Sequence, residues 1–445
     1  MSTSTTTSVA QTLADKLHQI RSQILQLDAE ALARQSGFLK RKPRKFVMPD
    51  FLLVLVSLAA EATLSLERIA SVISLVAHIP YSKQALSKRL NSSVERFLAR
   101  VAANLFANLS DGTRSQGLFG HFRRVLLHDS TVQALPEKLA GPFPGGRNQC
   151  PQKRASLKIQ FVADILNSTL VQCSLSGYTR NDQAASADIL EVARPGDLIM
   201  RDLGCFCLLV MNMIASMGAF FLSRYKHGVK VCDLEKRPLD LVRELRTYGR
   251  LDREVLLGSD YAPARLVATP VPDAVANERR RKARANHDGR YQPSKESLFL
   301  MGWNIFITNV SRQIWPAKSL LSLYRLRWRI EMVFKAWKSH LGFREFNARS
   351  ESLLRLSVMV KLLFCVLVHH FCDALELLGE GQQHVSLLRL ARIIGQCACL
   401  FAVAVLDITP QQWLEHQLKH HLYYEKREDR RNYFELLAEA GFALG

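Results

Sequence analysis

Apolar residues recur every three or four positions through the first hundred residues of the chain, and this spacing predicts an all-helical N-terminal region. In the segment LADKLHQIRSQILQL, the apolar residues that share one face of a helix are Leu13, Leu17, Ile20, Ile24 and Leu27. A second, buried helix is predicted for FLLVLVSLAAEA, because Pro49 and Asp50 provide a start signal just before it.

Two further helices are predicted on either side of Ile79–Pro80. Ser82 would cap the second one, which would expose Lys88 and Arg89 as the recognition helix of a helix-turn-helix does. A helical bundle with a basic surface explains the same pattern equally well. A basic linker around Pro43 precedes these helices and contains Lys40, Arg41, Lys42, Arg44 and Lys45.

From residue 121 the pattern changes to short apolar or alternating runs, which predict strands. RRVLLHD ends in Asp129 and GDLIMRDLG contains Asp202, while KIQFVADI and TLVQCSLSG between them predict a hairpin. Helices are predicted over 181–194 and around 206–217, followed by the strand AFFLSRYK. This order is typical of a mixed sheet covered by helices, so we predict a mixed α/β fold.

Residues 228–312 interrupt that order. They contain the β-like pieces REVLLG, ARLVATPV and LFLMGWNIFITN, together with a basic helix, ANERRRKARANHD, which carries Arg280 and Arg281. The segment is too long for a plain loop and predicts a β-rich insertion. Its basic helix either faces DNA or is solvated, and the basic character of the whole chain favours DNA.

These patterns divide the chain into five parts. We predict a helical N-terminal domain over 1–115, an α/β core in two parts over 116–227 and 313–375, a β-rich insertion subdomain over 228–312 and a C-terminal helical region over 376–445.

The composition indicates a globular protein that binds a polyanion. The chain has 445 residues, of which 48% are hydrophobic, and its 60 Lys and Arg against 40 Asp and Glu give a formal charge of +20. Such an excess charge opposes compaction unless a polyanion is the partner, so nucleic acid is the first candidate and an anionic membrane the second.

No segment of the sequence predicts a membrane span, since the best apolar run, near Leu52–Ala60, is shorter than the roughly 20 residues that a bilayer requires. The first residues, MSTSTTTSVA, do not resemble a signal peptide. The nine Cys form no CxxC pair, as expected for reduced core thiols. We therefore expect a cytoplasmic protein without a membrane partner.

The segment YRLRWRIEMVFKAWK carries polar residues at helical spacing among apolar ones. At about 100° per residue, one narrow stripe contains Tyr324, Arg327, Glu331, Lys335 and Lys338. Such a stripe suits a site where a carboxylate holds a divalent metal and cations grip phosphates. The structural alternative is an amphipathic helix with i,i+4 ion pairs.

Two acids at the ends of predicted strands, Asp129 and Asp202, together with Glu331 on a later helix, form the donor set required for two-metal phosphodiester chemistry. His128 is expected on the other face of its strand, because neighbouring side chains alternate. Three further acids near these strands have ordinary structural roles: Asp164 within a strand, Asp182 as a helix cap and Asp197 in a turn.

These residues resemble the bacterial insertion-sequence transposases of the DDE type, in the IS-four group. The mark of that group, Y-x2-R-x3-E-x6-K, is matched by Tyr324, Arg327, Glu331 and Lys338. VLLHDSTV is similar to its first-acid motif, and GDLIMRDLGCF followed by GAFFLSRYK is similar to its second-acid strand and the strand after it. The resemblance covers about residues 120–345, including an insertion of β character.

The resemblance implies an RNase H-like catalytic core interrupted by the insertion. In this core Asp129, Asp202 and Glu331 would hold two Mg²⁺ ions, which Mn²⁺ can replace. Residues expected to contact transposon-end phosphates are Tyr324, Arg327, Lys338 and, from its place on the stripe, Lys335. Trp303 either stacks on a flipped base or is an ordinary strand core residue.

The resemblance further implies cut-and-paste transposition in the bacterial cytoplasm, at the nucleoid. The double-stranded terminal repeats would be bound by the N-terminal domain and the insertion, and a homodimer would pair two ends before attack on target DNA. An RNase H-like nuclease or resolvase, which cleaves without joining, is one alternative. A catalytically silent DNA-binding regulator is the other, and the three acids disfavour it.

Overall fold

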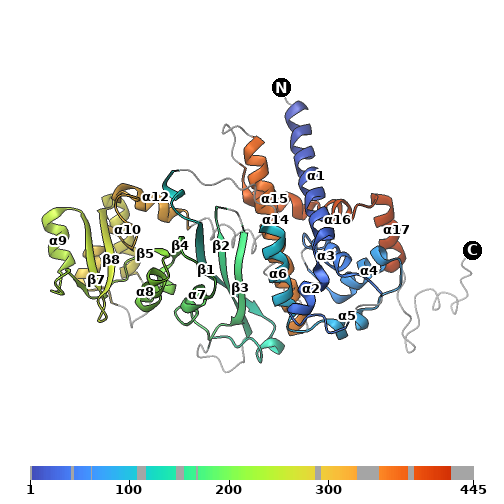
Figure 1. Cartoon of the computed structure of the whole chain (residues 1–445), viewed down its shortest axis with the longest axis horizontal. Helices are drawn as coiled ribbons and strands as arrows, with labels where there is room; N and C mark the ends of the chain where they lie inside the picture. Colours follow the sequence, from blue (N-terminus) through green and yellow to red (C-terminus); the bar gives the residue numbers. More distant parts are fainter. Residues whose placement is uncertain are drawn as a thin grey trace, which may run out of the picture.

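The computed structural model describes residues 3–41, 45–61, 63–107, 117–146, 155–166, 169–285, 292–327, 350–378 and 385–421. A large mixed sheet with covering helices lies beside a helical bundle (Figure 1). The mixed α/β class predicted from the sequence is therefore confirmed.

The helical bundle is built from both ends of the chain. Its N-terminal helices are α1 (Thr3–Gln26), α2 (Ala29–Gln35), α3 (Met48–Ser57), α4 (Leu66–Ala77), α5 (Lys83–Arg89) and α6 (Val94–Ala107). Its C-terminal helices are α14 (Glu351–Leu378), α15 (Leu387–Gln396), α16 (Ala398–Leu406) and α17 (Pro410–His421). Figure 1 shows the blue and the orange-red helices intermingled.

The two sets of helices share one hydrophobic core, because α16 packs against α1 and α3 while α14 packs against α6. Polar contacts also join them, since the Ser71 hydroxyl lies 2.9 Å from Nε2 of His416 and the Arg68 guanidinium lies 4.9 Å from the Trp413 ring centre. The described part of 376–445 therefore folds onto the N-terminal helices. The proposed boundaries of the five parts stay a prediction.

The described strands form a nine-stranded sheet with the order β3-β2-β1-β4-β5-β9-β8-β7-β6. The core strands are β1 (Arg124–Leu135), β2 (Ala155–Asp164), β3 (Thr169–Gly177), β4 (Asp197–Arg201) and β5 (Phe220–Arg224). β4 pairs parallel with β1 on one side and with β5 on the other, whereas β2 pairs antiparallel with β1 and with β3. The predicted hairpin of β2 and β3 is confirmed.

The strands of residues 228–312 extend the same sheet. They are β6 (Val231–Cys232), β7 (Leu251–Leu257), β8 (Ala262–Pro270) and β9 (Trp303–Thr308), with the helices α9 (Leu241–Tyr248), α10 (Asp273–Arg284) and α11 (Lys295–Leu300). β9 joins them to the core because it pairs with β5, with Thr308 opposite Leu222. In Figure 1 these yellow and green elements continue the row of strands at the left.

The prediction of one β-like piece for LFLMGWNIFITN was partly wrong. Its first residues belong to α11, which begins because the Ser294 hydroxyl accepts a hydrogen bond from the Ser297 amide at 3.0 Å. Only Trp303–Thr308 forms a strand.

Each face of the sheet is covered by its own hydrophobic cluster. Along β1, Val125 and Leu127 face the cluster shared with α6 and α14, whereas Leu126 faces a second cluster that contains α8 (Leu208–Ser216) and α7 (Ile189–Val192). Strand alternation sends successive side chains to opposite faces, so this pattern also assigns faces to the polar residues that follow.

The prediction that no segment has the length and apolarity of a membrane span was wrong. Helix Glu351–Glu376 is long and apolar enough to cross a membrane by length and composition alone. However, 83% of its most apolar window is buried inside the protein. The consecutive helices Leu387–Gln396 and Ala398–Leu406 together also reach the length and apolarity of a span, although the chain bends by 80° between them. Burial of this kind is typical of the core helix of a folded domain.

Candidate active site

The prediction that the first strand ends at Asp129 was wrong, because β1 continues to Leu135 and Asp129 lies within it. Asp129 and Asp202 nevertheless lie at the same level of neighbouring parallel strands. His128 of β1 pairs with Arg201 of β4, and Asp129 and Asp202 are the next residues of the two strands. Asp202 keeps an extended backbone (φ −82°, ψ 166°) before a 3₁₀ turn, Leu203–Cys205. By alternation, both carboxylates are on the face of Leu127 and Met200, which belong to the cluster shared with α14.

Tyr324 and Arg327 connect the predicted YREK segment to these two strands. The Tyr324 hydroxyl donates to the carbonyl oxygen of Arg201 at 3.3 Å, and Nη1 of Arg327 lies 3.2 Å from Oδ2 of Asp129. The Arg327 guanidinium also lies 5.6 Å from the Tyr324 ring centre. These contacts hold the start of the segment over both acids.

The predicted helix over 324–338 does not begin as expected. Tyr324 belongs to the last turn of α12 (Leu320–Arg325), and residues 326–327 form a turn. Tyr324 is buried, which raises the pKa of its phenol to about 12, and its hydroxyl is directed at a backbone carbonyl. Its predicted phosphate contact stays a prediction.

Three predicted site residues, Glu331, Lys335 and Lys338, lie outside the described residues. In the part of the chain that the structure describes, no cluster of three or more His, Cys, Asp and Glu side chains could hold a metal ion. Asp129 and Asp202 are nevertheless hard oxygen donors of the kind that Mg²⁺ prefers. The donor chemistry of these two residues therefore fits a divalent metal.

A buried polar network occupies the opposite face of the same strands. His128 is fully buried, and its Nδ1 lies 3.1 Å from Nη2 of Arg201. Burial and then the charge of Arg201 lower the pKa of His128 to about 3, so the imidazole is neutral near pH 7. As expected, His128 faces away from Asp129 and its neutral ring is a partner of Arg201.

Asp182 is a site residue that the sequence did not reveal. The predicted helix cap is instead Asn181, whose side-chain oxygen accepts from the Ala184 amide at 2.7 Å. The Asp182 carboxylate accepts hydrogen bonds from Ser130 Oγ (2.6 Å) and Gln160 Nε2 (2.9 Å) and pairs with Lys158 Nζ (2.9 Å). Burial raises the pKa of Asp182, but these three donors outweigh burial and lower it.

Asp182 also contacts the loop that follows the second acid. A Cβ atom on Gly204 would lie 3.2 Å from Oδ2 of Asp182, so the loop passes close to this carboxylate. Asp182 therefore links Ser130, the neighbour of Asp129, to Gly204, two residues after Asp202. The sequence feature that could have indicated the partners of Asp182 is the pair of polar residues Lys158 and Gln160, which alternation places on one face of β2. The sequence did not show that both side chains are buried.

The buried thiol of Cys205 feels the charges of all three acids. Its pKa is raised to about 12, chiefly by burial, while the charge of Arg201 lowers it and the negative charges of Asp182, Asp129 and Asp202 raise it further. The two other strand acids have structural partners: Asp197 pairs with Arg124, and Asp164 accepts from the Val125 amide.

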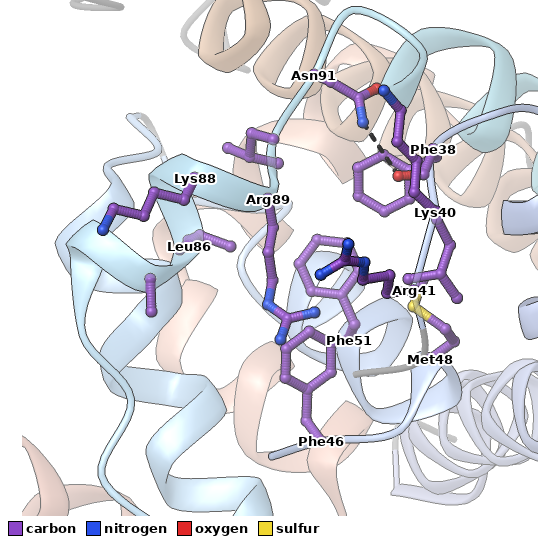
Figure 2. Close-up of a pocket in the computed structure, with 13 residues that line it drawn as sticks. Phe38, Lys40, Arg41, Phe46, Met48, Phe51, Leu86, Lys88, Arg89 and Asn91 are labelled. Atoms are coloured by element: carbon purple, nitrogen blue, oxygen red, sulfur yellow. Dashed lines mark hydrogen bonds between the residues drawn. The ribbon is translucent and has the colours of Figure 1, made fainter. Parts of the chain in front are cut away.

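Four of the predicted N-terminal DNA contacts line one pocket of about 1280 Å³ (Figure 2). They are Lys40, Arg41, Lys88 and Arg89. Lys45 is directed elsewhere, with Nζ donating to the Pro80 carbonyl at 3.4 Å, and Lys42 and Arg44 lie outside the described residues. As predicted, Ser82 caps α5 by accepting from the Ala85 amide at 3.2 Å.

The predicted contacts in the insertion have partners within the protein. Arg280 Nε donates to the Leu298 carbonyl at 3.0 Å, and Arg281, which is exposed, pairs with Glu278 at 2.8 Å. Trp303 packs against the second hydrophobic cluster, with its ring centre 6.2 Å from that of Phe299. A DNA contact by these three residues stays a prediction.

Comparisons with known proteins give a consistent set of similarities. The family model described as Transposase DDE domain matches residues 120–368. The transposase for insertion sequence element IS231E of Bacillus thuringiensis subsp. finitimus is 27% identical over 79% of this chain and 78% of its own length. The transposase for IS1151 of Clostridium perfringens is 25% identical over 69% and 70%.

Among solved structures, a chain of the piggyBac transposase synaptic complex with hairpin DNA matches with a TM-score of 0.41 and 10% identity. The match covers 97% of this chain and 90% of that one. This similarity is too low to bear on function.

Proposed function

The chain belongs to the Transposase DDE domain family, among the bacterial insertion-sequence transposases, and we propose that it cleaves and joins DNA at the ends of its element. The observation that carries this proposal is the placement of Asp129 and Asp202 at one level of neighbouring parallel strands, with Arg327 paired to Asp129. Carboxylates placed on or directly after the rigid strands of a sheet are well suited to hold metal ligands in a fixed geometry for phosphodiester chemistry.

The sheet segment β3-β2-β1-β4-β5 supports an RNase H-like core. Its first acid is on the central strand β1 and its second acid directly follows the adjacent strand β4. In this proposal residues 228–312 are an insertion between the second acid and the glutamate. Glu331 would complete the set of acids from the segment that begins at Tyr324 and Arg327.

Asp129, Asp202 and Glu331 would hold two Mg²⁺ ions, which Mn²⁺ can replace. When bound, such ions activate water or a 3′-hydroxyl and stabilise the leaving oxygen. Arg327 balances the charge of Asp129 and fixes its orientation through the 3.2 Å contact. His128 takes no part as a base, because its neutral ring is buried on the opposite face.

The formal charge of +20 supports double-stranded DNA as the partner. The terminal inverted repeats would be bound by the N-terminal helices and the insertion, with Lys335, Lys338 and Trp303 near the cleaved strand. A homodimer would pair two ends. The four cations of the N-terminal pocket are the described residues that best support such a DNA contact.

A strand-transfer assay tests the proposal. Purified protein is incubated with end-containing DNA, a target plasmid and Mg²⁺. We expect Asp129→Asn, Asp202→Asn and Glu331→Gln each to lower joining by at least about 100-fold, because each removes a charged metal ligand, while DNA binding is retained. Asp260→Asn is the matched control, since Asp260 is exposed in the turn between β7 and β8.

The alternatives give different results in the same assay. Cleavage without joining by the unchanged protein would identify a nuclease or resolvase. Binding without cleavage would identify a regulator. Joining that survives in the Asp129→Asn variant would contradict the assignment of this residue as a metal ligand.

A further inference from the structure

The N-terminal pocket lies between the chain that leaves α2, the start of α3 and the end of α5 (Figure 2). Its wall combines the aromatic residues Phe38, Phe46 and Phe51 with the four cations already named. Its lining, within the described residues, contains no acid. A pocket of about 1280 Å³ easily admits a nucleotide, since ligand pockets commonly measure about 300–1,000 Å³.

Two of the cations enter the pocket itself. Figure 2 shows the Arg41 and Arg89 side chains reaching into the hollow, whereas Lys88 extends away from the aromatic rings. Among the described residues, no carboxylate pairs with Arg41 or Arg89 within 4.0 Å. Two guanidinium groups in one pocket repel each other, so an anion between them is favoured.

An aromatic ring is held beside these cations. Phe46 is half-buried, and its orientation is fixed by Tyr81, whose ring meets it edge-on at 5.4 Å. The Arg89 guanidinium lies 5.7 Å from the centre of the Phe46 ring. Beneath it, Phe51 lies 5.7 Å from Phe46 and stacks with Phe38 at 6.0 Å. The pocket therefore offers a rigid flat apolar surface next to two positive charges.

We propose that this pocket holds one unpaired nucleotide of the end DNA, with its phosphate between Arg41 and Arg89 and its base against Phe46. This inference rests on the proposed function, because it takes DNA as the partner. Paired bases have their flat faces covered by their neighbours in the stack, so only an unpaired or extruded base can reach Phe46. Stacking platforms beside cationic grooves bind single-stranded nucleic acid in this way.

Fluorescence anisotropy with the full chain tests the inference. Two labelled end DNAs are compared, one fully paired and one of the same sequence with a single unpaired adenine placed at successive positions. We expect at least one unpaired position to bind about tenfold more tightly than paired DNA. Phe46→Leu is expected to abolish that preference and leave the affinity for paired DNA unchanged.

Arg41→Gln and Arg89→Gln are expected to weaken binding of the unpaired DNA more than binding of the paired DNA. Arg250→Gln, which changes an exposed arginine of the insertion, is the control and should leave the ratio of the two affinities unchanged. Phe46→Trp should retain the preference. This variant separates loss of the aromatic surface from loss of folding, which thermal melting followed by circular dichroism also checks.

Equal affinity of the unchanged protein for both DNAs at every position would overturn the inference and leave DNA binding intact. Failure to bind either DNA would instead contradict the proposed function. A preference that Phe46→Leu retains would overturn the base contact. Deoxyadenosine monophosphate that competes as strongly as the unpaired DNA would show that the pocket takes a free nucleotide, which overturns the assignment to a DNA strand.

Discussion

At the scale of single residues, one carboxylate lies between strand β1, which carries Asp129, and the turn that follows Asp202. Asp182 receives hydrogen bonds from Ser130 and Gln160 and pairs with Lys158, which is only 5% exposed. A buried lysine without its partner carries a desolvation cost. Asp182 therefore stabilises β1 and β2 directly beside Asp129.

We expect Asp182→Asn to lower the free energy of unfolding by about 1–3 kcal/mol, because it leaves the Lys158 charge without a carboxylate. Lys158→Met in the same background should recover most of this loss, since it removes the unpaired charge. Urea denaturation measures both. Additive losses in the double variant would show that the two residues do not interact.

Lys361 is a buried cation far from the proposed site. Its Nζ donates to the Ala59 carbonyl at 3.0 Å and to the Glu61 carbonyl, and burial lowers its pKa from 10.5 to about 8. Between these values the unfolded chain binds the proton more tightly than the folded protein does. Its contribution to the free energy of unfolding therefore rises with pH across this range.

The contribution of Lys361 to the free energy of unfolding should increase by at most about 1.4 kcal/mol per pH unit. Chemical denaturation between about pH 7 and pH 10 should show it as a difference between the unchanged protein and Lys361→Met, which lacks this proton. Parallel pH profiles of the two proteins would contradict the lowered pKa.

At the scale of elements, α12 holds the start of the YREK segment against the strand that carries the second acid. The buried Tyr324 ring packs on Phe306 of β9 at 5.2 Å, and its hydroxyl donates to the Arg201 carbonyl. Sequence periodicity correctly grouped Tyr324 with Arg327. It could not show that the phenol is directed at backbone, because that contact joins residues 123 positions apart.

Tyr324→Phe should therefore act through positioning. We expect it to lower the free energy of unfolding by about 0.5–1.5 kcal/mol through loss of one hydrogen bond, and to leave affinity for end DNA unchanged. Anisotropy and thermal melting measure the two effects. A loss of DNA affinity as large as that of Arg327→Gln would instead support a direct phosphate contact by the phenol.

At the scale of the whole molecule, the two ends of the chain form one folded unit. Phe401 of α16 is buried, and its ring meets Phe364 of α14 edge-on at 5.4 Å within the core that the N-terminal helices share. The C-terminal helices therefore support the helices that line the N-terminal pocket, although more than 300 residues separate α3 from α16.

Phe401→Ala should lower the stability of this unit by about 3–5 kcal/mol, because it opens a cavity in the shared core. Leu400→Ala, on the same helix but with Leu400 57% exposed, is the matched control and should change stability by less than about 0.5 kcal/mol. Hydrogen exchange of α3 and α4 should speed up only in the first variant. Unchanged exchange there would show that the ends fold independently.

The sequence by itself determined the elements and the candidate acids. Periodicity reports which side of a helix or strand avoids water, so the helix that contains Ile20 and Ile24, the β2–β3 hairpin and the apolar strand segments before Asp129 and Asp202 could be predicted locally. The end of β1 could not, because the strand continues to Leu135. The resemblance carried by Tyr324, Arg327, Glu331 and Lys338 led to the family that the comparisons confirm. The start of LFLMGWNIFITN was wrongly predicted to be a strand, because Leu298–Leu300 belong to α11, which the Ser294 cap begins.

Only the tertiary structure decided which distant residues meet. It gave the capping role expected of Asp182 to Asn181, brought Arg201 into contact with His128, and built the N-terminal pocket from residues 38–51 and 85–91. The pattern of apolar and polar residues along the chain shows which side chains avoid water. It does not show which distant residues they contact. Hydrogen bonds, ion pairs and pockets depend on distances between separate segments, and those distances are set only when the sheet and the bundle assemble.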